Sequence, residues 1–246
     1  MNIIGIIQAR MGSTRLPNKV MKKILDKPML FYMIDRIKHS KYINQIVVAT
    51  STLSSDDIIE EFCNKNKINI YRGSEIDVLD RFYQSSLLYQ ADIIVRFTGD
   101  CPLIDPKIVD HVIDKHVLTK ADYTSNTLVR SFPRGLDVEV FNFSTLASAN
   151  KHSLKRYERE HVTPYIYENP DRFKLSGITA EGELFRPDIR ITVDTIEDFQ
   201  FITTLFNLLY DKKDIIETID IITLLNEKPE LLNINSQIKQ KKYNGE

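Results

Sequence analysis

The first hundred residues alternate short β-branched runs with segments of helical periodicity, and this alternation limits the possible folds more than any other feature. Continuous apolar runs fill Ile3 to Gln8, Gln45 to Thr50, Asn69 to Tyr71 and Asp92 to Phe97, with a helical pattern at Met29 to Ile37 among the segments between them. Strands that are apolar on both sides need cover on both faces, and crossover helices join them in parallel. The sequence therefore predicts an α/β fold with a mainly parallel sheet and helices on both faces.

Two of the predicted helices follow capping residues. Ser55 or its neighbour caps one helix, and Asp77 precedes the next. The apolar faces that we expect are Ile58, Ile59 and Phe62 in the first helix and Val78, Leu79, Phe82 and Leu87 in the second.

The second half of the chain departs from this rhythm. Between about Ala121 and Ile178, predicted strands at Asp122 to Asn126 and Leu136 to Phe141 flank Pro133-Arg134-Gly135, and a helix follows near Ser144 to Asn150. We interpret residues 121–178 as an inserted lobe of a single domain that spans residues 1–246.

The pattern beyond this lobe predicts a strand, a helix and a tail. The strand is expected at Arg190 to Val193 and an amphipathic helix at Asp198 to Leu209. The tail, residues 229–246, ends in Lys239-Gln240-Lys241-Lys242 and is interpreted as a solvated end.

Composition excludes several classes of protein. Lys and Arg number 33 against 34 Asp and Glu, so no overall field favours nucleic acid or an anionic membrane. Two cysteines, Cys63 and Cys101, are too few for a disulfide scaffold, which fits a reducing cytoplasm. Gln8 and Arg10 interrupt the apolar amino terminus, and no stretch approaches the roughly 20 apolar residues of a membrane span. We expect a cytoplasmic protein without nucleic-acid or membrane partners.

A cationic loop follows the first predicted strand. It reads Gln8-Ala9-Arg10-Met11-Gly12-Ser13-Thr14-Arg15-Leu16-Pro17-Asn18-Lys19. Arginine forks and a lysine neutralise phosphate oxygens, while Gly12 permits close backbone approach and Ser13 supplies a hydroxyl. The loop has neither the P-loop nor the dinucleotide fingerprint. Its place at the carboxyl end of a strand favours a polyphosphate site over a merely solvated basic loop.

Two aspartates follow predicted strands far apart in the sequence. Asp100 follows Gly99 after one strand, and Asp194 follows Arg190 to Val193. Two carboxylates with substrate phosphates form a usual magnesium site. The alternative for Asp194 is a helix N-cap. A cationic loop and two such carboxylates together are typical of magnesium-assisted attack on a nucleoside triphosphate.

Several motifs resemble the cytidylyltransferases that activate acidic sugars, nearest the spore coat polysaccharide biosynthesis protein F branch. Besides the loop, the motifs are Arg-Gly-Ser-x-x-Asp-Val-Leu-Asp-Arg-Phe at 72–82, Thr-Gly-Asp-Cys-Pro-Leu-Ile at 98–104, Gly-Leu-Asp-Val-Glu-Val at 135–140, Glu-Arg-Glu-His-Val-Thr-Pro at 158–164 and Val-Asp-Thr at 193–195. The resemblance covers residues 1 to about 200. It implies a glycosyltransferase-A-like, Rossmann-like domain, CTP and Mg2+ as ligands, a CMP-sugar as product, and a homodimer.

The resemblance also implies roles for individual residues. The triphosphate loop holds Arg10, Gly12, Ser13, Arg15 and Lys19, and the base and ribose lie beside Gly73, Ser74, Asp77 and Arg81. Lys19, Asp100 and Asp194 are the expected catalytic residues, and both aspartates bind the metal. The expected sugar-binding residues are Gln8, Arg134, Glu139 and His161. Structural roles are the alternatives for Arg81, which can cover core residues, and for His161.

The predicted reaction is attack of a sugar hydroxyl on the α-phosphorus of CTP, with release of pyrophosphate. One alternative is a glycosyltransferase that uses a nucleotide sugar, although Gly99-Asp100-Cys101-Pro102 lacks the Asp-x-Asp usual in that class. Another is a non-catalytic nucleotide-binding subunit. Aromatic residues of the lobe are expected to form either a dimer contact or a local core: Phe132, Phe141, Phe143, Tyr165 and Tyr167.

Overall fold

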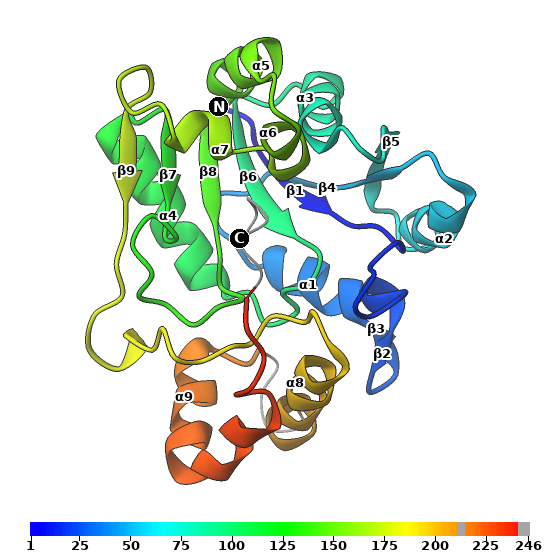
Figure 1. The fold of residues 1–246 in the computed structure, drawn as a ribbon, viewed down its shortest axis with the longest axis vertical. Helices are drawn as coiled ribbons and strands as arrows, with labels where there is room; N and C mark the ends of the chain where they lie inside the picture. Colours follow the sequence, from blue (N-terminus) through cyan, green and yellow to red (C-terminus); the bar gives the residue numbers. More distant parts are fainter. Residues whose placement is uncertain (211–214, 241–246) are drawn as a thin grey trace.

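A seven-stranded sheet runs through the centre of the molecule in the computed structural model, which describes residues 1–210 and 215–240 (Figure 1). The strands follow one another in space as β5-β4-β1-β6-β8-β7-β9. Their bounds are β1 Ile3–Gln8, β4 Gln45–Ser51, β5 Asn69–Gly73, β6 Ile93–Thr98, β7 Tyr123–Ser125, β8 Glu139–Asn142 and β9 Leu175–Gly177. A separate two-stranded hairpin consists of β2 Lys23–Ile24 and β3 Lys27–Pro28.

The sheet is mainly parallel, as the sequence predicts. Strand β1 pairs in parallel with both β4 and β6, and β4 with β5, whereas β8 runs antiparallel to β6 and β7. The register of β1 and β6 sets Gln8 opposite Thr98. The loops that follow these two strands therefore leave the sheet side by side.

Helices cover both faces of the sheet, each against its own apolar cluster. Ile3 and Ile7 of β1 belong to one cluster, and Ile4 and Ile6 to the other, because successive strand residues point to opposite faces. Helices on the first face are α1 Met29–Ile37, α2 Asp57–Lys65, α4 Pro106–Thr119, α8 Ile196–Leu209 and α9 Thr218–Glu227. Helices on the second are α3 Val78–Leu88, α5 Phe143–His152, α6 Arg156–His161 and α7 Pro164–Tyr167.

Short 3-10 helices join these elements in the part of the chain that the structure describes: η1 Lys19–Met21, η2 Ser54–Asp56, η3 Gly182–Leu184 and η5 Pro229–Ile234. Within the described residues, no helix is both long and apolar enough to cross a bilayer.

Two apolar side chains lie on a different helix face from the predicted one. Ile58 and Leu87 are exposed, and the core of α2 is instead filled by Ile59 and Cys63. In α3, Ser85 and Ser86 occupy the buried positions beyond Phe82. A surface helix buries only one stripe, and Ile58 and Leu87 lie outside it.

The segment 121–178 extends the central sheet. Its strands β7, β8 and β9 continue the sheet beyond β6, and its helices α5, α6 and α7 cover one face (Figure 1). The change of rhythm in the sequence thus coincides with the antiparallel strand β8. The aromatic residues of the segment form local core. Phe141 and Tyr165 are buried in the second cluster, with Phe143 and Tyr167 packed partly buried against it, and Phe132 is buried in the first.

The predicted strand at Arg190 to Val193 is wrong. A single parallel bridge links Arg190 to Arg134, and further along Val193 donates to the carbonyl of Asp100 at 2.9 Å. The partner backbone turns at Gly135, whose φ is +105°, so a ladder cannot continue. The extended segment nevertheless delivers Asp194 to the sheet edge.

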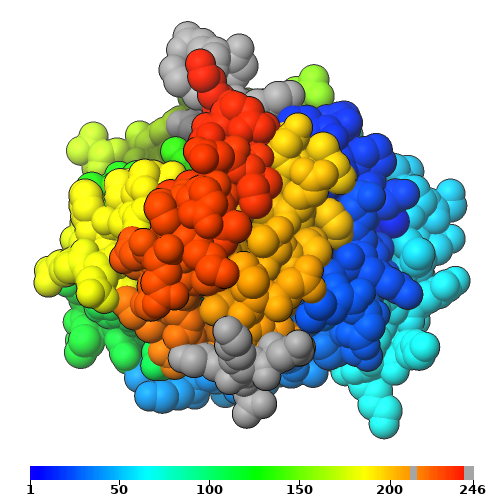
Figure 2. All heavy atoms as spheres, turned by 90° about the horizontal axis from the view of Figure 1, so that it is seen from below, coloured from blue at the N-terminus to red at the C-terminus, as the bar shows by residue number. Residues whose placement is uncertain are grey.

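The prediction of a solvated tail is wrong for residues 229–240, which pack against the protein. Leu231, Leu232 and Ile234 pack against the main core, and Asn235 is buried. Figure 2 shows this segment in red, lying against α8 in gold and α9 in orange. Lys241 and Lys242 lie outside the described residues.

We predict that Gly135→Ala lowers the free energy of unfolding by more than about 2 kcal/mol, since φ is positive and backbone atoms are in the way. A Cβ there meets the carbonyl carbon and oxygen of Ile191 at 2.6 Å. Gly182→Ala is the matched control, because φ is +57° with nothing within 4 Å. Urea unfolding of both variants measures the difference; equal losses contradict the steric argument.

Candidate active site at the carboxyl edge of the sheet

A buried carboxylate shapes the loop that follows β1. Asp56 accepts from the backbone N–H of Met11 at 2.8 Å and from the hydroxyls of Thr50 and Ser51. Burial alone raises the pKa of Asp56, but these donors outweigh it and the pKa is lowered. The sequence around Asp56 indicates only the start of a helix and gives no sign of this role. The loop is therefore preformed by an ionised group from η2.

Lys19 lies between the two aspartates that the sequence singled out. Its Nζ is 2.9 Å from Oδ2 of Asp100 and 3.0 Å from Oδ1 of Asp194, and it donates to the carbonyl of Val193 at 2.8 Å. Asp100 follows β6, and Lys19 begins η1. The three predicted catalytic residues, from three distant parts of the chain, thus share one point.

The charges of this cluster support one another. Burial alone raises the pKa of Asp100, but Lys19 and the hydroxyl of Thr98 lower it to about 2. Burial lowers the pKa of Lys19, yet Asp100 and Asp194 raise it above its ordinary value. Both groups therefore stay charged at neutral pH.

Asp194 faces the site and does not cap helix α8. The N-cap is Thr195, which forms a capping box with Asp198. The second oxygen of Asp194, Oδ2, contacts Arg15 at 3.0 Å and Arg190 at 2.8 Å. The triphosphate loop and the extended segment are thus joined through one carboxylate.

The two aspartates fit a hard divalent cation. Their oxygens converge on a single positive charge, which Lys19 supplies, and carboxylate oxygens are preferred magnesium ligands. Within residues 1–210 and 215–240, no cluster of three or more potential metal ligands exists. A metal held here takes its remaining ligands from substrate phosphates and water.

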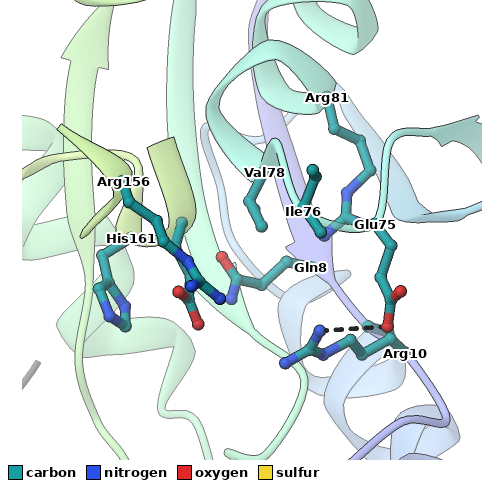
Figure 3. Close-up of a pocket in the computed structure, with 10 residues that line it drawn as sticks. Gln8, Arg10, Glu75, Ile76, Val78, Arg81, Arg156 and His161 are labelled. Carbon is teal, nitrogen blue, oxygen red and sulfur yellow. Dashed lines mark hydrogen bonds and ion pairs between the residues drawn. The ribbon is translucent and has the colours of Figure 1, made fainter. Parts of the chain in front are cut away.

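One cavity opens beside the triphosphate loop (Figure 3). It has a volume of about 290 Å³ and is lined by Gln8, Arg10, Arg81 and His161, among others. Arg81 is only 2% exposed, and its Nε has no hydrogen-bond partner among the described residues. Burial, and then Arg10, lower the pKa of Arg81 to about 10. A buried cation that lacks full pairing favours a hydrogen-bonding ligand in this cavity.

A second cavity, of about 480 Å³, lies across the end of β6. Arg134, Glu139 and His161 line it. Glu139 already accepts from Tyr123 at 2.7 Å, from Thr163 at 2.6 Å and from Arg96, so it braces the wall. No ion pair or side-chain hydrogen bond is found for Arg134 in the part of the chain that the structure describes. Burial, and then the positive charge of Arg130, lower the pKa of Arg134.

Seven of the nine predicted nucleotide residues line neither cavity: Gly12, Ser13, Arg15, Lys19, Gly73, Ser74 and Asp77. Asp77 caps α3 by accepting from Asp80 at 2.9 Å and pairs with Arg159. Ser74 accepts from the backbone N–H of Asp77 at 3.1 Å. Gly73 ends β5, and Gly12 lies exposed in the loop. The remaining loop residue, Ser13, donates its backbone N–H to the carbonyl of Met11 at 2.9 Å.

A strained turn places His161 between the two cavities. Val162 has φ 73° and ψ −56°, and the N–H of Thr163 donates to the carbonyl of His161 at 2.9 Å, which defines a γ-turn of the rare hand. Strain of this kind, in a β-branched residue, concentrates at functional sites. Burial lowers the pKa of His161, so its ring is neutral at pH 7. The sequence carries no signal for this conformation.

The comparisons with known proteins agree with this geometry. A family model described as cytidylyltransferase matches residues 4–238. This chain belongs to the cytidylyltransferase family. An uncharacterised protein of Methanocaldococcus jannaschii is 44% identical over 246 residues, covering 99% of this chain and 98% of that protein. The spore coat polysaccharide biosynthesis protein SpsF of Bacillus subtilis is 35% identical over 234 residues, covering 93% and 96%.

Solved structures share the fold of this cytidylyltransferase. One from Leptospira borgpetersenii serovar Hardjo-bovis has a TM-score of 0.90 at 34% identity and covers 98% of this chain and 100% of that chain. A CMP:2-keto-3-deoxy-manno-octonic acid synthetase complexed with CTP has a TM-score of 0.62 at 16% identity, covering 85% and 99%, a likeness of fold alone. The α/β fold class is confirmed, and the protein is an enzyme that transfers a cytidylyl group.

We predict that Lys19→Met tightens Mn2+ binding in the absence of nucleotide by about tenfold or more, because two converging carboxylates lose their cation. Electron paramagnetic resonance of the full chain with Mn2+ measures it. Lys23→Met, at an exposed neighbouring position, is the control. Unchanged or weaker binding in Lys19→Met contradicts a cation position shared by Asp100 and Asp194.

Proposed function

We propose that this enzyme transfers CMP from CTP to a hydroxyl of an acidic sugar, with release of pyrophosphate, for surface polysaccharide or glycoconjugate synthesis. The observation that carries the proposal is the convergence of Lys19, Asp100 and Asp194 after β1, β6 and the extended segment near residue 190. Two cavities share His161, and Gln8 of one lies opposite Thr98 of the other in the sheet. Two adjacent cavities at this edge of the sheet suit a transfer between two substrates.

The nucleotide is assigned to the cavity beside the triphosphate loop. Arg10 and Arg15 can fork onto phosphate oxygens. Asp100 and Asp194 would hold Mg2+, which neutralises phosphate charge and aligns the α-phosphorus for in-line attack. Lys19 then leaves the carboxylates to the metal and offsets negative charge on the phosphates.

The acidic sugar is assigned to the second cavity. Arg134 supports this, because it lines the cavity and its charge is disfavoured by burial and by Arg130, so an anionic ligand would stabilise it. A sugar carboxylate accepts two parallel hydrogen bonds from a guanidinium. The synthetase of similar fold that was solved with CTP is named for an acidic sugar, 2-keto-3-deoxy-manno-octonic acid.

The cytoplasmic location and the homodimer belong to the same proposal. Cys63 and Cys101 are free and buried, which suits a reducing compartment. The homodimer rests on the family resemblance, because Phe141 and Tyr165 are buried within one chain. A contact would instead use exposed apolar residues such as Leu154, which is 91% exposed.

A pyrophosphate-release screen tests the function. CTP, UTP, GTP and ATP are each combined with acidic and neutral sugars, and we expect release with CTP and an acidic sugar. Asp100→Asn and Asp194→Asn should each reduce turnover by roughly 100 to 1000-fold, since one oriented electrostatic group is lost.

Other products of that screen would contradict the proposal in distinct ways. Consumption of a nucleotide sugar with release of free nucleotide would identify a glycosyltransferase. Release of pyrophosphate only with neutral sugars would reject the acidic acceptor. Near-normal turnover of both asparagine variants would reject the two-carboxylate site.

We predict that Arg134→Ala raises the Michaelis constant for the sugar by roughly 10 to 100-fold while changing that for CTP little, because one charge-assisted contact is lost. Arg10→Ala is the contrasting variant and should chiefly raise the constant for CTP. Steady-state kinetics with both substrates varied measures the split. A selective CTP defect in Arg134→Ala would assign that residue to the nucleotide.

A further inference from the structure

The C-terminal segment, residues 229–240, packs beside Asp194 although the sequence separates them by more than thirty residues. Its 3-10 helix η5 contacts α8 and α9, and it crosses the surface next to the segment that carries Asp194 (Figure 2). Leu231, Leu232 and Ile234 anchor it in the main core. The segment therefore has a fixed place at the catalytic edge.

Asn235 joins this segment to the residues behind Asp194. The side chain is 3% exposed, and its Nδ2 donates to the carbonyl of Arg190 at 3.1 Å and to Oδ1 of Asp198 at 3.0 Å. A buried amide with two partners on different residues fixes both of them.

Asp198 and Arg190 in turn hold Asp194. Asp198 is fully buried and accepts from the backbone N–H of Asp194 at 2.9 Å and of Thr195 at 3.1 Å. Arg190 donates from Nη2 to Oδ2 of Asp194 at 2.8 Å and from Nε to Asp198 at 2.9 Å. The position of one catalytic carboxylate thus depends on one guanidinium.

Gln240 holds the remaining edge of that guanidinium. Its Oε1 accepts from Nη1 of Arg190 at 2.6 Å. Gln240 also lines the second cavity and a smaller one of about 280 Å³ that Arg134 shares. All three nitrogens of Arg190 therefore have partners, and the C-terminal segment supplies one of them.

We propose that the C-terminal segment supplies two positioning residues, Asn235 and Gln240, which hold Arg190 and thereby orient Asp194 toward the cation position that it shares with Asp100. This inference rests on the proposed function, because it assigns Asp194 to a metal. Without these two partners Arg190 keeps Asp198 and Asp194, but its Nη1 loses the bond to Gln240 and Asp198 loses the bond from Asn235. Asp194 is then held less firmly in its orientation. Asn235 lines neither substrate cavity, whereas Gln240 lines the second, so Mn2+ affinity rather than the Michaelis constant for the sugar is the deciding readout.

The test compares Asn235→Ala and Gln240→Ala with matched controls from the same segment in the full chain. Asn233→Ala and Gln237→Ala change the same residue types at exposed positions. Mn2+ binding with a non-hydrolysable CTP analogue is measured by electron paramagnetic resonance, and kinetics with CTP and the sugar found in the screen follow. We expect both test variants to bind Mn2+ more weakly and turn over more slowly, by roughly 10 to 100-fold, as for partners that orient metal ligands.

A merely structural role predicts a different pattern. It lowers the melting temperature and the amount of folded enzyme, but leaves Mn2+ affinity and turnover per folded molecule at the control values, and that outcome overturns the proposal. If Asn235→Ala does not fold, Gln240→Ala decides, since Gln240 is exposed. The proposal is also overturned if Gln240→Ala and Gln237→Ala bind Mn2+ with equal affinity.

The proposed function fails separately. Wild-type enzyme that releases no pyrophosphate with any sugar, yet binds Mn2+ more tightly than Asn235→Ala and Gln240→Ala, contradicts the assigned reaction and leaves the positioning role standing. If both test variants match the wild type in turnover and in Mn2+ affinity, only the positioning role is contradicted.

Discussion

The contact of one ammonium with two carboxylates organises this enzyme. Lys19 lies at 2.9 Å from Asp100 and 3.0 Å from Asp194. Three parts of the chain therefore meet at one point: the loop after β1, the loop after β6 and the extended segment near residue 190. Partly buried charges destabilise a fold unless they are paired, and removing one partner leaves the others uncompensated. The same pairing lowers the pKa of Asp100, so that carboxyl stays ionised.

Much of the surrounding structure braces that contact. Asp56 fixes the loop that carries Arg10 and Arg15, and Arg190 fixes Asp194 from behind. The two cavities are braced in a similar way, by a strained turn at Val162 and by Glu139 with its three donors. These groups are buried, and they hold the side chains around the charge cluster and the cavities in place.

Local pattern was a good guide to the sheet and a poor guide to the elements that complete it. The parallel strands were predictable because burial on both faces requires continuous apolar runs such as Ile3 to Gln8. The extended run at Arg190 to Val193 is also rich in β-branched residues but forms no ladder, because its partner turns at Gly135. The tail was predicted to be solvated because its end is charged, and nothing in the local sequence indicates that the amide of Asn235 is buried. Pairing partners, which no local pattern contains, decided both cases.

The sequence by itself determined the α/β class, the cationic loop after the first strand and the candidates Lys19, Asp100 and Asp194, because these follow from periodicity and from residue chemistry after predicted strands. Only the tertiary structure decided that one ammonium joins both carboxylates, that Thr195 rather than Asp194 caps α8, and that residues near 235 stand behind the site. Contacts between residues far apart in the chain depend on how the elements pack, and packing is a property of the whole fold rather than of any segment.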